Sequence, residues 1–515
     1  MILEEKYKLY QIAYHLLKAD YNILYMDESR EEIWLEKPSG NISIVVRLIR
    51  KGFGWNKHMK EDIEKTAQQM KRFKRIFLGN KVEIHNVYIS TYQPADEWDQ
   101  LKRPLNLEDR KLADMHVYYL DQASSREEEA RFLSAARVHP LNHSDPLAIS
   151  EKVKRLQFYL NYLTDTLNTK QKEIEKLFSY GRPVFTYLLL SINIIIYMIM
   201  EYYGDTTSID DLVKFGAKYN PAIIEGEWWR ILTSMFLHIG FLHLLMNMLA
   251  VYYIGSLTEK IYGSFRFLII YILAGIGGGL ASFAFTVNVS AGASGALFGL
   301  FGALLFFGLV HKRIFFQTIG MNIIILVGIN IVFGLAVPQI DNGAHIGGLV
   351  AGFIAAGIVH LPRRGNSIIQ ILALSVYLLS LTVLVVYGTE HNLNRQSYQL
   401  LRVEEALMEG NYEAVVDITT DALEIDGDLD GLLLFQRSYA YIETGQIDLA
   451  KEDLEKSIEA KDPLPEAYYN LALIYNEEGN MEKAEEMAAE AYKLRPDNED
   501  FADLYKRLKE ENAHR

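Results

Sequence analysis

Residues 183–388 form an almost continuous apolar region within a chain of 515 residues. The region contains about seven runs that are long enough to cross the roughly 30 Å hydrocarbon core of a bilayer. A region of this kind must satisfy its backbone polar groups internally, so we expect a multi-pass α-helical membrane protein. The expected spans are residues 183–201, 237–256, 265–286, 294–311, 319–337, 343–361 and 367–387.

The two ends of the chain differ from this apolar centre because they are rich in Lys, Glu and Asp. We therefore expect three domains, at residues 1–178, 179–390 and 391–515. The pattern of the first domain predicts a soluble α/β fold. Its expected helices are 4–18, 58–75 and 151–176, and its expected strands are 21–26, 42–49 and 82–91.

Residues 396–495 repeat a pattern with a period of about 34 residues. Glycines mark the period at positions 410, 445 and 479, and the best copy covers residues 467–496. The pattern resembles the tetratricopeptide repeat, a helical hairpin that stacks into an α-solenoid with a concave peptide-binding face. An ordinary helical bundle is the alternative. The C-terminal domain is thus expected to bind protein partners.

The loops between the spans predict the orientation of the chain in a cell membrane. If the helices alternate, the basic residues before the first span and after the second, fourth and sixth spans all fall on one side, which should be cytoplasmic. These residues are Lys172, Lys176, Arg182, Lys260, Arg266, Lys312, Arg313, Arg363 and Arg364. We therefore expect a cytoplasmic N-terminus and, with an odd number of spans, an extracytoplasmic C-terminus.

The composition argues against several functions. A formal net charge of −14 does not suit nucleic-acid binding, which requires a basic surface. The chain has no cysteine, so a disulfide, a thiolate nucleophile and a Cys-ligated zinc site are impossible. The histidines of the N-terminal domain lack a metal-ligand spacing, and we expect no metal and no cofactor. They are His58, His85, His116, His139 and His143.

Polar residues inside membrane helices are costly and therefore suggest function. Ser294 lies among small residues in the sequence Gly-Ala-Ser-Gly, and His345 lies early in the sixth span, at a similar depth. A neutral His can act as general base for a Ser hydroxyl. In the second span, His243 and Asn247 share one helix face, from which both can donate hydrogen bonds to an oxyanion.

Each of these residues also has a simpler interpretation. A single Ser in a membrane helix usually bonds to a carbonyl of its own helix or to a neighbouring helix. A single His is more often a packed polar contact or an ion ligand, and a His-x-x-x-Asn pair can join two helices. The occurrence of all three features at matching depth favours catalysis over these separate interpretations.

Together these residues resemble the rhomboid family of intramembrane serine proteases. The resemblance covers roughly residues 180–365 and rests on Gly-Ala-Ser-Gly, on Ala-His-x-x-Gly-x-x-x-Gly and on the preceding His-x-x-x-Asn. It implies that Ser294 is the nucleophile and His345 its base, a dyad without Asp. Asn247, His243 and the backbone N–H of Ser294 would then stabilise the oxyanion.

Other positions match the same family. Phe298 is placed where the family has an aromatic side chain against the catalytic His, while Trp229, Arg230 and Glu259 match structural positions. The layout is most similar to bacillus-type rhomboids, which have a cytoplasmic N-terminal domain, a seven-helix rhomboid core and external tetratricopeptide repeats.

The resemblance implies an endopeptidase that cleaves transmembrane segments of other membrane proteins, within membrane lipid and without a cofactor. Substrates would enter laterally, past the fifth span, and unwind beside Ser294. Three other functions remain open. An adaptor that presents membrane proteins to another protease is the main alternative. A transporter or channel would suit the glycine-interrupted helices, and a pure scaffold would rest on the repeats.

Overall fold

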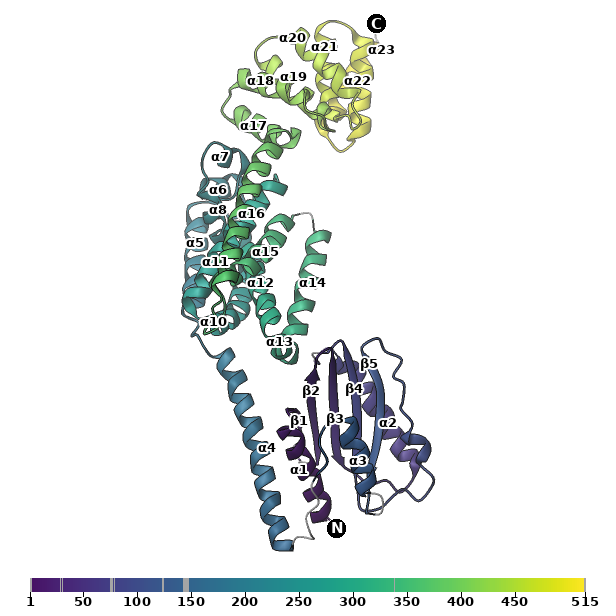
Figure 1. Cartoon of the computed structure of the whole chain (residues 1–515). Coiled ribbons are helices and arrows are strands. Elements are labelled where there is room, and N and C mark those ends of the chain that lie inside the picture. Colours follow the sequence, from purple (N-terminus) through teal and green to yellow (C-terminus); the bar gives the residue numbers. More distant parts are fainter. Residues whose placement is uncertain are drawn as a thin grey trace. The chain divides into compact units, whose positions relative to one another are not determined.

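The computed structural model describes residues 2–27, 29, 31–74, 77, 79–122, 125–141, 148–337 and 339–513. Two compact units are present, and each is described by itself (Figure 1). The first comprises Met1–Gly181 with Leu305–Leu326, and the second comprises Arg182–Leu304 with Val327–Arg515.

The N-terminal domain is built on one five-stranded sheet in the order β1-β2-β3-β4-β5. The first three strands pair antiparallel, and β4 and β5 continue the sheet in parallel. The strands are β1 (Asn22–Met26), β2 (Glu32–Ser39), β3 (Ile42–Arg50), β4 (Lys81–Ile89) and β5 (Leu112–Leu120). The helices are α1 (Ile2–Lys18), α2 (Asn56–Phe73), the 3₁₀ turn η2 (Asp99–Lys102), α3 (Ser125–Ala135) and α4 (Ile149–Phe178).

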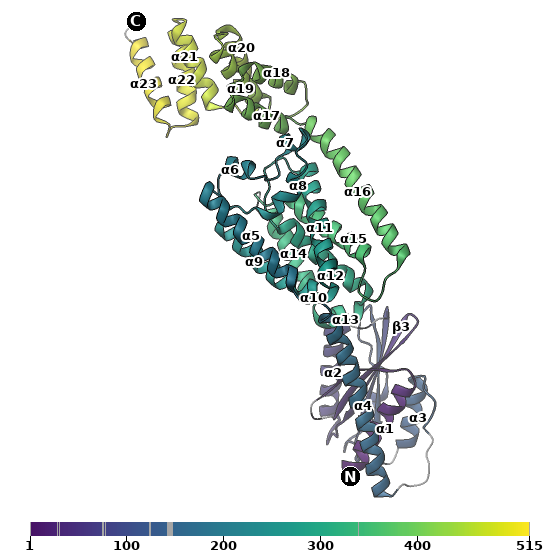
Figure 2. The ribbon, with the colours of Figure 1, turned by 90° about the vertical axis from the view of Figure 1, so that its left-hand side faces the viewer.

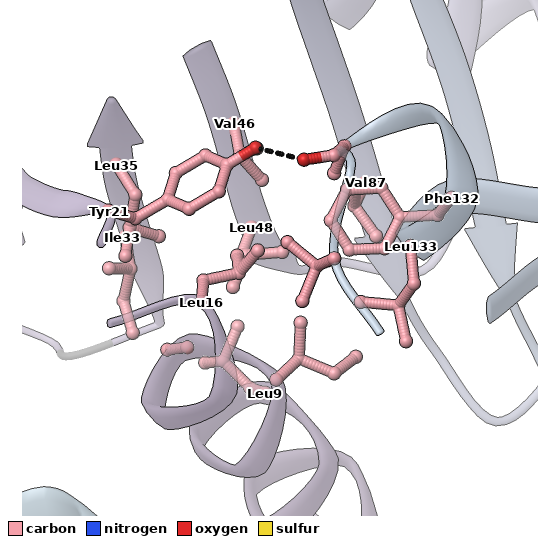
Figure 3. Close-up of a cluster of buried hydrophobic side chains, with 14 of the residues drawn as sticks. Leu9, Leu16, Tyr21, Ile33, Leu35, Val46, Leu48, Val87, Phe132 and Leu133 are labelled. Carbon is pink, nitrogen blue, oxygen red and sulfur yellow. Dashed lines mark hydrogen bonds between the residues drawn. The ribbon is translucent and has the colours of Figure 1, made fainter. Parts of the chain in front are cut away.

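Both faces of this sheet are covered by helices. The central strand β3 is buried along almost its whole length, as expected from its largely apolar sequence. Leu9 and Leu16 of α1 pack on one face with Phe132 of α3, and the hydroxyl of Tyr21 donates a hydrogen bond to the carbonyl of Ala136 at 2.7 Å (Figure 3). Apolar residues of α2 cover the other face. The predicted N-terminal α/β fold is confirmed.

Among the residues that the structure describes, five helices of the membrane core are long and apolar enough to cross a bilayer. They are α5 (Val184–Tyr203), the continuous segment Gly240–Tyr262, α11 (Ser264–Phe285), α15 (Asn342–Val359) and α16 (Ser367–Leu393). A sixth span is possible if α13 (Lys312–Thr318) and α14 (Gly320–Ala336), which bend by 74°, act together. The helix α12 (Ser294–Val310) is apolar but shorter. The multi-pass helical fold is confirmed, and the count of seven spans stays a prediction.

The segment Gly240–Tyr262 changes its helical geometry midway. It consists of α9 (Gly240–Ala250), a π-helical turn η4 (Val251–Gly255) and α10 (Ser256–Tyr262). Beyond the turn, the carboxylate of fully buried Glu259 accepts hydrogen bonds from the backbone N–H groups of Phe185 and Thr186, at 3.0 and 2.8 Å. These N–H groups belong to the first turn of α5 and have no partner within that helix. Glu259 therefore joins the second span to the start of the first.

Glycines allow α12 and α15 to approach closely. A Cβ added to Gly348 would lie 2.0 Å from the carbonyl oxygen of Gly295, and one added to Gly352 would lie 2.1 Å from that of Gly299. Only hydrogen fits at these positions, because the neighbouring atoms belong to the backbone of the other helix. Small residues at a helix–helix interface allow this close approach of backbones within a membrane.

A loop region between α5 and α9 carries short helices. They are α6 (Ile209–Lys214), α7 (Asn220–Ile224), α8 (Arg230–Thr233) and the 3₁₀ turn η3 (Ser234–Phe236). Arg230 holds this region together, since its Nη1 donates to the carbonyls of Val213 and Ala217 at 2.6 and 3.3 Å. The contacts agree with the structural position that the resemblance gives to Arg230.

Helical hairpins make up the C-terminal region (Figure 2). Their helices are α17 (Gln396–Met408), α18 (Tyr412–Leu423), α19 (Asp430–Glu443), α20 (Ile447–Ile458), α21 (Pro465–Glu477), α22 (Met481–Leu494) and a final α23 (Glu499–Ala513). The three period-marking glycines, Gly410, Gly445 and Gly479, all adopt positive φ, between 69° and 77°. This left-handed conformation follows the first helix of each hairpin, where glycine is preferred. The predicted α-solenoid is confirmed.

Candidate active site

The candidate site is built from the first turns of α12 and α15. Ser294 is the first residue of α12, and His345 lies in the first turn of α15. Nε2 of His345 lies 2.9 Å from Oγ of Ser294, which is hydrogen-bond distance. The glycine contacts between these two helices bring the side chains together from positions far apart in the sequence.

The imidazole of His345 is held by stacking. Its ring lies nearly parallel to that of Phe298, at 12° and with a centroid separation of 4.1 Å. Its buried Nδ1 has no hydrogen-bond partner among the described residues. No carboxylate therefore orients the ring in the way that an Asp orients the His of a Ser-His-Asp triad. Phe298 does so instead, from one turn beyond Ser294.

His243 and Asn247 lie on α9, beside the start of α12. A Cβ added to Gly292 would lie 2.8 and 3.0 Å from Cε1 and Nε2 of His243, so the imidazole lies against Gly292. The buried Asn247 donates its Nδ2 to the backbone carbonyl of His243 at 3.1 Å. The structure thus brings His243 next to the segment that carries Ser294, and it places Asn247 one helical turn further along.

His238 also lies at this site, although the sequence patterns did not point to it. It is fully buried, and its Nε2 lies 3.5 Å from the backbone N–H of Ala293, the residue before Ser294. The ring also meets that of His243 edge to face, at 5.4 Å. The sequence does contain a hint of this residue, because His238 is a second histidine shortly before His243 in the same apolar run.

A small cavity adjoins Ser294. Its volume is about 20 Å³, and its polar lining includes Lys218, Ser234, Ser282 and Ser290. A volume of this order, with several polar partners, is enough to hold a single water molecule. Ser294 thus borders a polar space inside an otherwise apolar helical bundle.

Within the described ranges, no group of three or more His, Cys, Asp or Glu side chains is placed so that it could hold a metal ion. His85 and His116 stack at 5.5 Å on neighbouring strands. His143 lies outside the described residues.

Comparisons with known proteins agree with this geometry. Residues 225–362 match the Rhomboid domain family, and residues 433–462 and 465–498 match the Tetratricopeptide repeat family. Rhomboid protease GluP of Bacillus subtilis (strain 168) is 35% identical over 478 residues, which is 92% of each chain. Rhomboid protease AarA of Providencia stuartii is 27% identical over 47% of this chain and 94% of its own. RHOMBOID-like protein 5 of Arabidopsis thaliana is 39% identical over 31% of this chain and 53% of its own.

The likeness to GluP extends through both ends of the chain, because it covers far more than the 225–362 segment. The chain is a multi-pass membrane protein with a tetratricopeptide region, and it is a serine protease that belongs to the rhomboid family.

Proposed function

We propose that this protein is an intramembrane endopeptidase in which Ser294 and His345 form the catalytic dyad. The observation that carries the proposal is the 2.9 Å approach of Oγ of Ser294 to Nε2 of His345. The two side chains come from different helices, whose glycine contacts leave little freedom to separate them. A chance polar contact would not need the stacked ring of Phe298 behind the imidazole.

The proposed reaction has two steps. Oγ of Ser294 attacks the carbonyl carbon of the scissile peptide bond while Nε2 of His345 takes the hydroxyl proton. The tetrahedral intermediate collapses when the peptide C–N bond breaks and His345 returns that proton to the leaving amine. Water then attacks the acyl-enzyme ester, with His345 again as base, and the new carboxyl product and the Ser294 hydroxyl are released. The cavity beside Ser294 offers this water a place.

The oxyanion of the intermediate would be stabilised by the N–H of Ser294 and by the side chains of His243 and Asn247. In the structure, Nδ2 of Asn247 donates a hydrogen bond to the backbone carbonyl of His243, in its own helix. It would therefore turn, or share its second hydrogen, when negative charge develops on the substrate oxygen. Donors aimed at a developing oxyanion contribute mainly to the transition state.

We expect Asn247→Ala to lower kcat by about 10²–10³-fold while KM changes little, since the lost hydrogen bond forms chiefly in the transition state. Steady-state cleavage of a transmembrane substrate in detergent measures both constants. Asn394→Ala is the matched control. Asn394 also donates Nδ2 to the carbonyl four residues before it, at 2.9 Å, but it is exposed. Equal effects of the two substitutions would contradict the assignment.

The substrate class follows from the site's position in the membrane core. A spanning helix hides its carbonyls in internal hydrogen bonds, so a cleavable segment must unwind locally. We expect segments with Gly or Pro near the outer end of the span to be cleaved, and matched all-Leu segments to resist. Mass spectrometry of products from liposomes containing the purified chain and each segment tests this. Equal cleavage of both segments, or cutting at the cytoplasmic end, would count against the proposal.

We also propose that the N-terminal domain, residues 1–178, is cytoplasmic and that the tetratricopeptide domain, residues 391–515, is extracytoplasmic. The basic loops support this orientation. Because the chain has no cysteine of its own, labelling of a single introduced cysteine reports the side of the membrane on which that residue lies. In intact cells, a membrane-impermeant maleimide is expected to label Lys506→Cys and to spare Lys65→Cys, both at exposed positions. The reverse pattern would invert the topology. In the proposed topology, the tetratricopeptide hairpins lie outside the cell and are free to bind extracytoplasmic protein partners.

A further inference from the structure

Lys218 is a fully buried lysine in the loop region between α6 and α7. Its ammonium donates hydrogen bonds to the backbone carbonyls of Thr286 and Asn288, at 2.7 and 2.8 Å. Its backbone also pairs with Ser290 in both directions, at 2.9 and 3.1 Å. Lys218 is thus bonded to the connection between α11 and α12 at Thr286, Asn288 and Ser290. This connection leads directly into Ser294.

Asp341, at the start of α15, binds the same connection between α11 and α12. It is the N-cap of α15, where its carboxylate accepts the backbone N–H of Ala344 at 2.9 Å. The same carboxylate accepts hydrogen bonds from the hydroxyls of Thr286, at 3.1 Å, and of Ser282. The backbone N–H of His345 donates to the carbonyl of Asp341 at 3.2 Å. Asp341 therefore joins the start of α15 to the end of α11.

The charges of Lys218 and Asp341 stabilise each other. Burial lowers the pKa of Lys218 to about 8, and Asp341 opposes that shift. Burial alone would raise the pKa of Asp341, but Lys218 and the hydrogen-bond donors keep it below its usual range. An ammonium in an apolar site is costly unless it is compensated. An apolar side chain could fill this volume at lower cost, so the retained charges call for a role beyond packing.

We propose that Lys218 and Asp341 form a positioning pair that fixes Ser294 and His345 at reacting distance. The pair meets on the 286–290 connection, where Lys218 binds the carbonyls of Thr286 and Asn288 and Asp341 binds the hydroxyl of Thr286. Ser294 follows this connection, and His345 follows Asp341 by one turn. Neither member of the pair touches the substrate. The inference rests on the proposed dyad and concerns how that dyad is held.

The test measures how fast Ser294 reacts with a fluorophosphonate, which reports the nucleophile without a transmembrane substrate. We expect Lys218→Met and Asp341→Asn to lower the rate constant of labelling by about tenfold to 10²-fold, because a misplacement near 1 Å costs about 10²-fold and a smaller one costs less. The labelled fraction should stay at the parental level. For a cleaved segment, kcat should fall in parallel while KM stays within about twofold.

A role in folding alone gives a different result. It would lower the labelled fraction, since fewer molecules would be native, and leave the rate constant of the native molecules unchanged. That outcome, or parental kinetics in both variants, overturns the proposal. Asp341→Asn decides the matter if Lys218→Met does not accumulate, because it keeps the shape of the N-cap while it removes the charge and one of the two acceptor oxygens.

The pH profile supplies an independent readout. Among the described residues, the charge that acts on Lys218 is that of Asp341. Lys218 is charged below its pKa of about 8, so the pair is intact there and is lost as the pH rises above that value. The parental labelling rate should then fall across this range. Lys218→Arg, which stays charged, should keep its rate, and Lys218→Met should be slow on both sides. A parental fall that persists in Lys218→Arg overturns the proposal.

Failure of the dyad itself would look different. If the parental chain is not labelled, or if Ser294→Ala is labelled equally, the proposed function fails and the positioning role fails with it. If the parental chain is labelled and Ser294→Ala is not, but the Lys218 and Asp341 variants match the parental chain, the dyad stands and the positioning pair does not.

Discussion

Replacing Ser294 with alanine is expected to lower kcat for a cleaved transmembrane segment by about 10⁴-fold or more, to the limit of detection. The substitution removes the oxygen that forms the acyl-enzyme, and no other hydroxyl takes its place against His345 in the 2.9 Å contact. His345→Ala should be nearly as severe, since the hydroxyl is a weak nucleophile without its base. Quantitative cleavage of a labelled segment in liposomes is the measurement.

The combination of both substitutions should be no worse than either alone, because residues that act as one unit have non-additive effects. Ser380→Ala serves as the control. Ser380 also lies in a membrane helix, α16, where its hydroxyl donates to the carbonyl of Val376 at 2.8 Å. Cleavage that survives in Ser294→Ala, or is equally lost in a folded Ser380→Ala, would refute the dyad. The adaptor alternative would gain if Ser294→Ala still promoted turnover of client proteins in cells.

The second large effect is expected from Gly352→Ala. The added Cβ would lie 2.1–2.4 Å from the backbone atoms of Gly299, and backbone cannot rotate away as a side chain can. The helices α12 and α15 must then separate. Overpacking of this kind costs about 1–3 kcal/mol of stability. Because Ser294 and His345 lie on these two helices, the dyad should open as well, and a misplacement near 1 Å costs about 10²-fold in rate.

Gly328→Ala is the matched control for this prediction. Gly328 lies within α14, another apolar helix, and a Cβ added there meets no atom within 4 Å. Thermal unfolding in detergent and cleavage kinetics of both variants give the comparison. We expect the control to be close to the parent. Parental stability and activity in Gly352→Ala would show that the helices are less tightly packed than the backbone positions imply.

The membrane core was largely predictable because each apolar run maps directly onto a helix. The boundaries of α5, α11 and α15 lie within a few residues of the expected spans. The bend of 74° between α13 and α14 was not predictable, since hydropathy reports how apolar a segment is and not the direction in which it runs. The limits of the three domains stay predictions.

Two strands of the N-terminal sheet were missed, and their sequences explain why. The strand β2 contains Glu32, Glu36 and Lys37, and β5 contains Asp114, so neither shows a clean apolar alternation. Fully buried Glu36 accepts a hydrogen bond from Ser43 of the adjacent strand at 2.8 Å. Such compensation comes from tertiary contacts, which a local sequence pattern does not contain.

At the candidate site, too, some residues could be predicted from the sequence and others could not. Ser294, His345, His243 and Asn247 were chosen because polar residues within apolar runs are conspicuous. Lys218 was not chosen, since in a polar loop a lysine normally lies in water. Only the fold reveals that this loop folds back on the 286–290 connection and buries the ammonium there. The partners of Asp341 were hidden for the same reason.

The π-helical turn at Val251–Gly255 constrains how the second span can change in length. Each residue of a helix turns the chain by about 100°, and a π turn accommodates one extra residue. His243 before the turn lies against Gly292, while Glu259 after it reaches the start of α5. Deleting one residue here would restore a regular helix but rotate one half against the other, so one of the two contacts would be lost. This span should therefore resist the insertion or deletion of a residue at the turn, because its two ends make contacts that must both keep their direction.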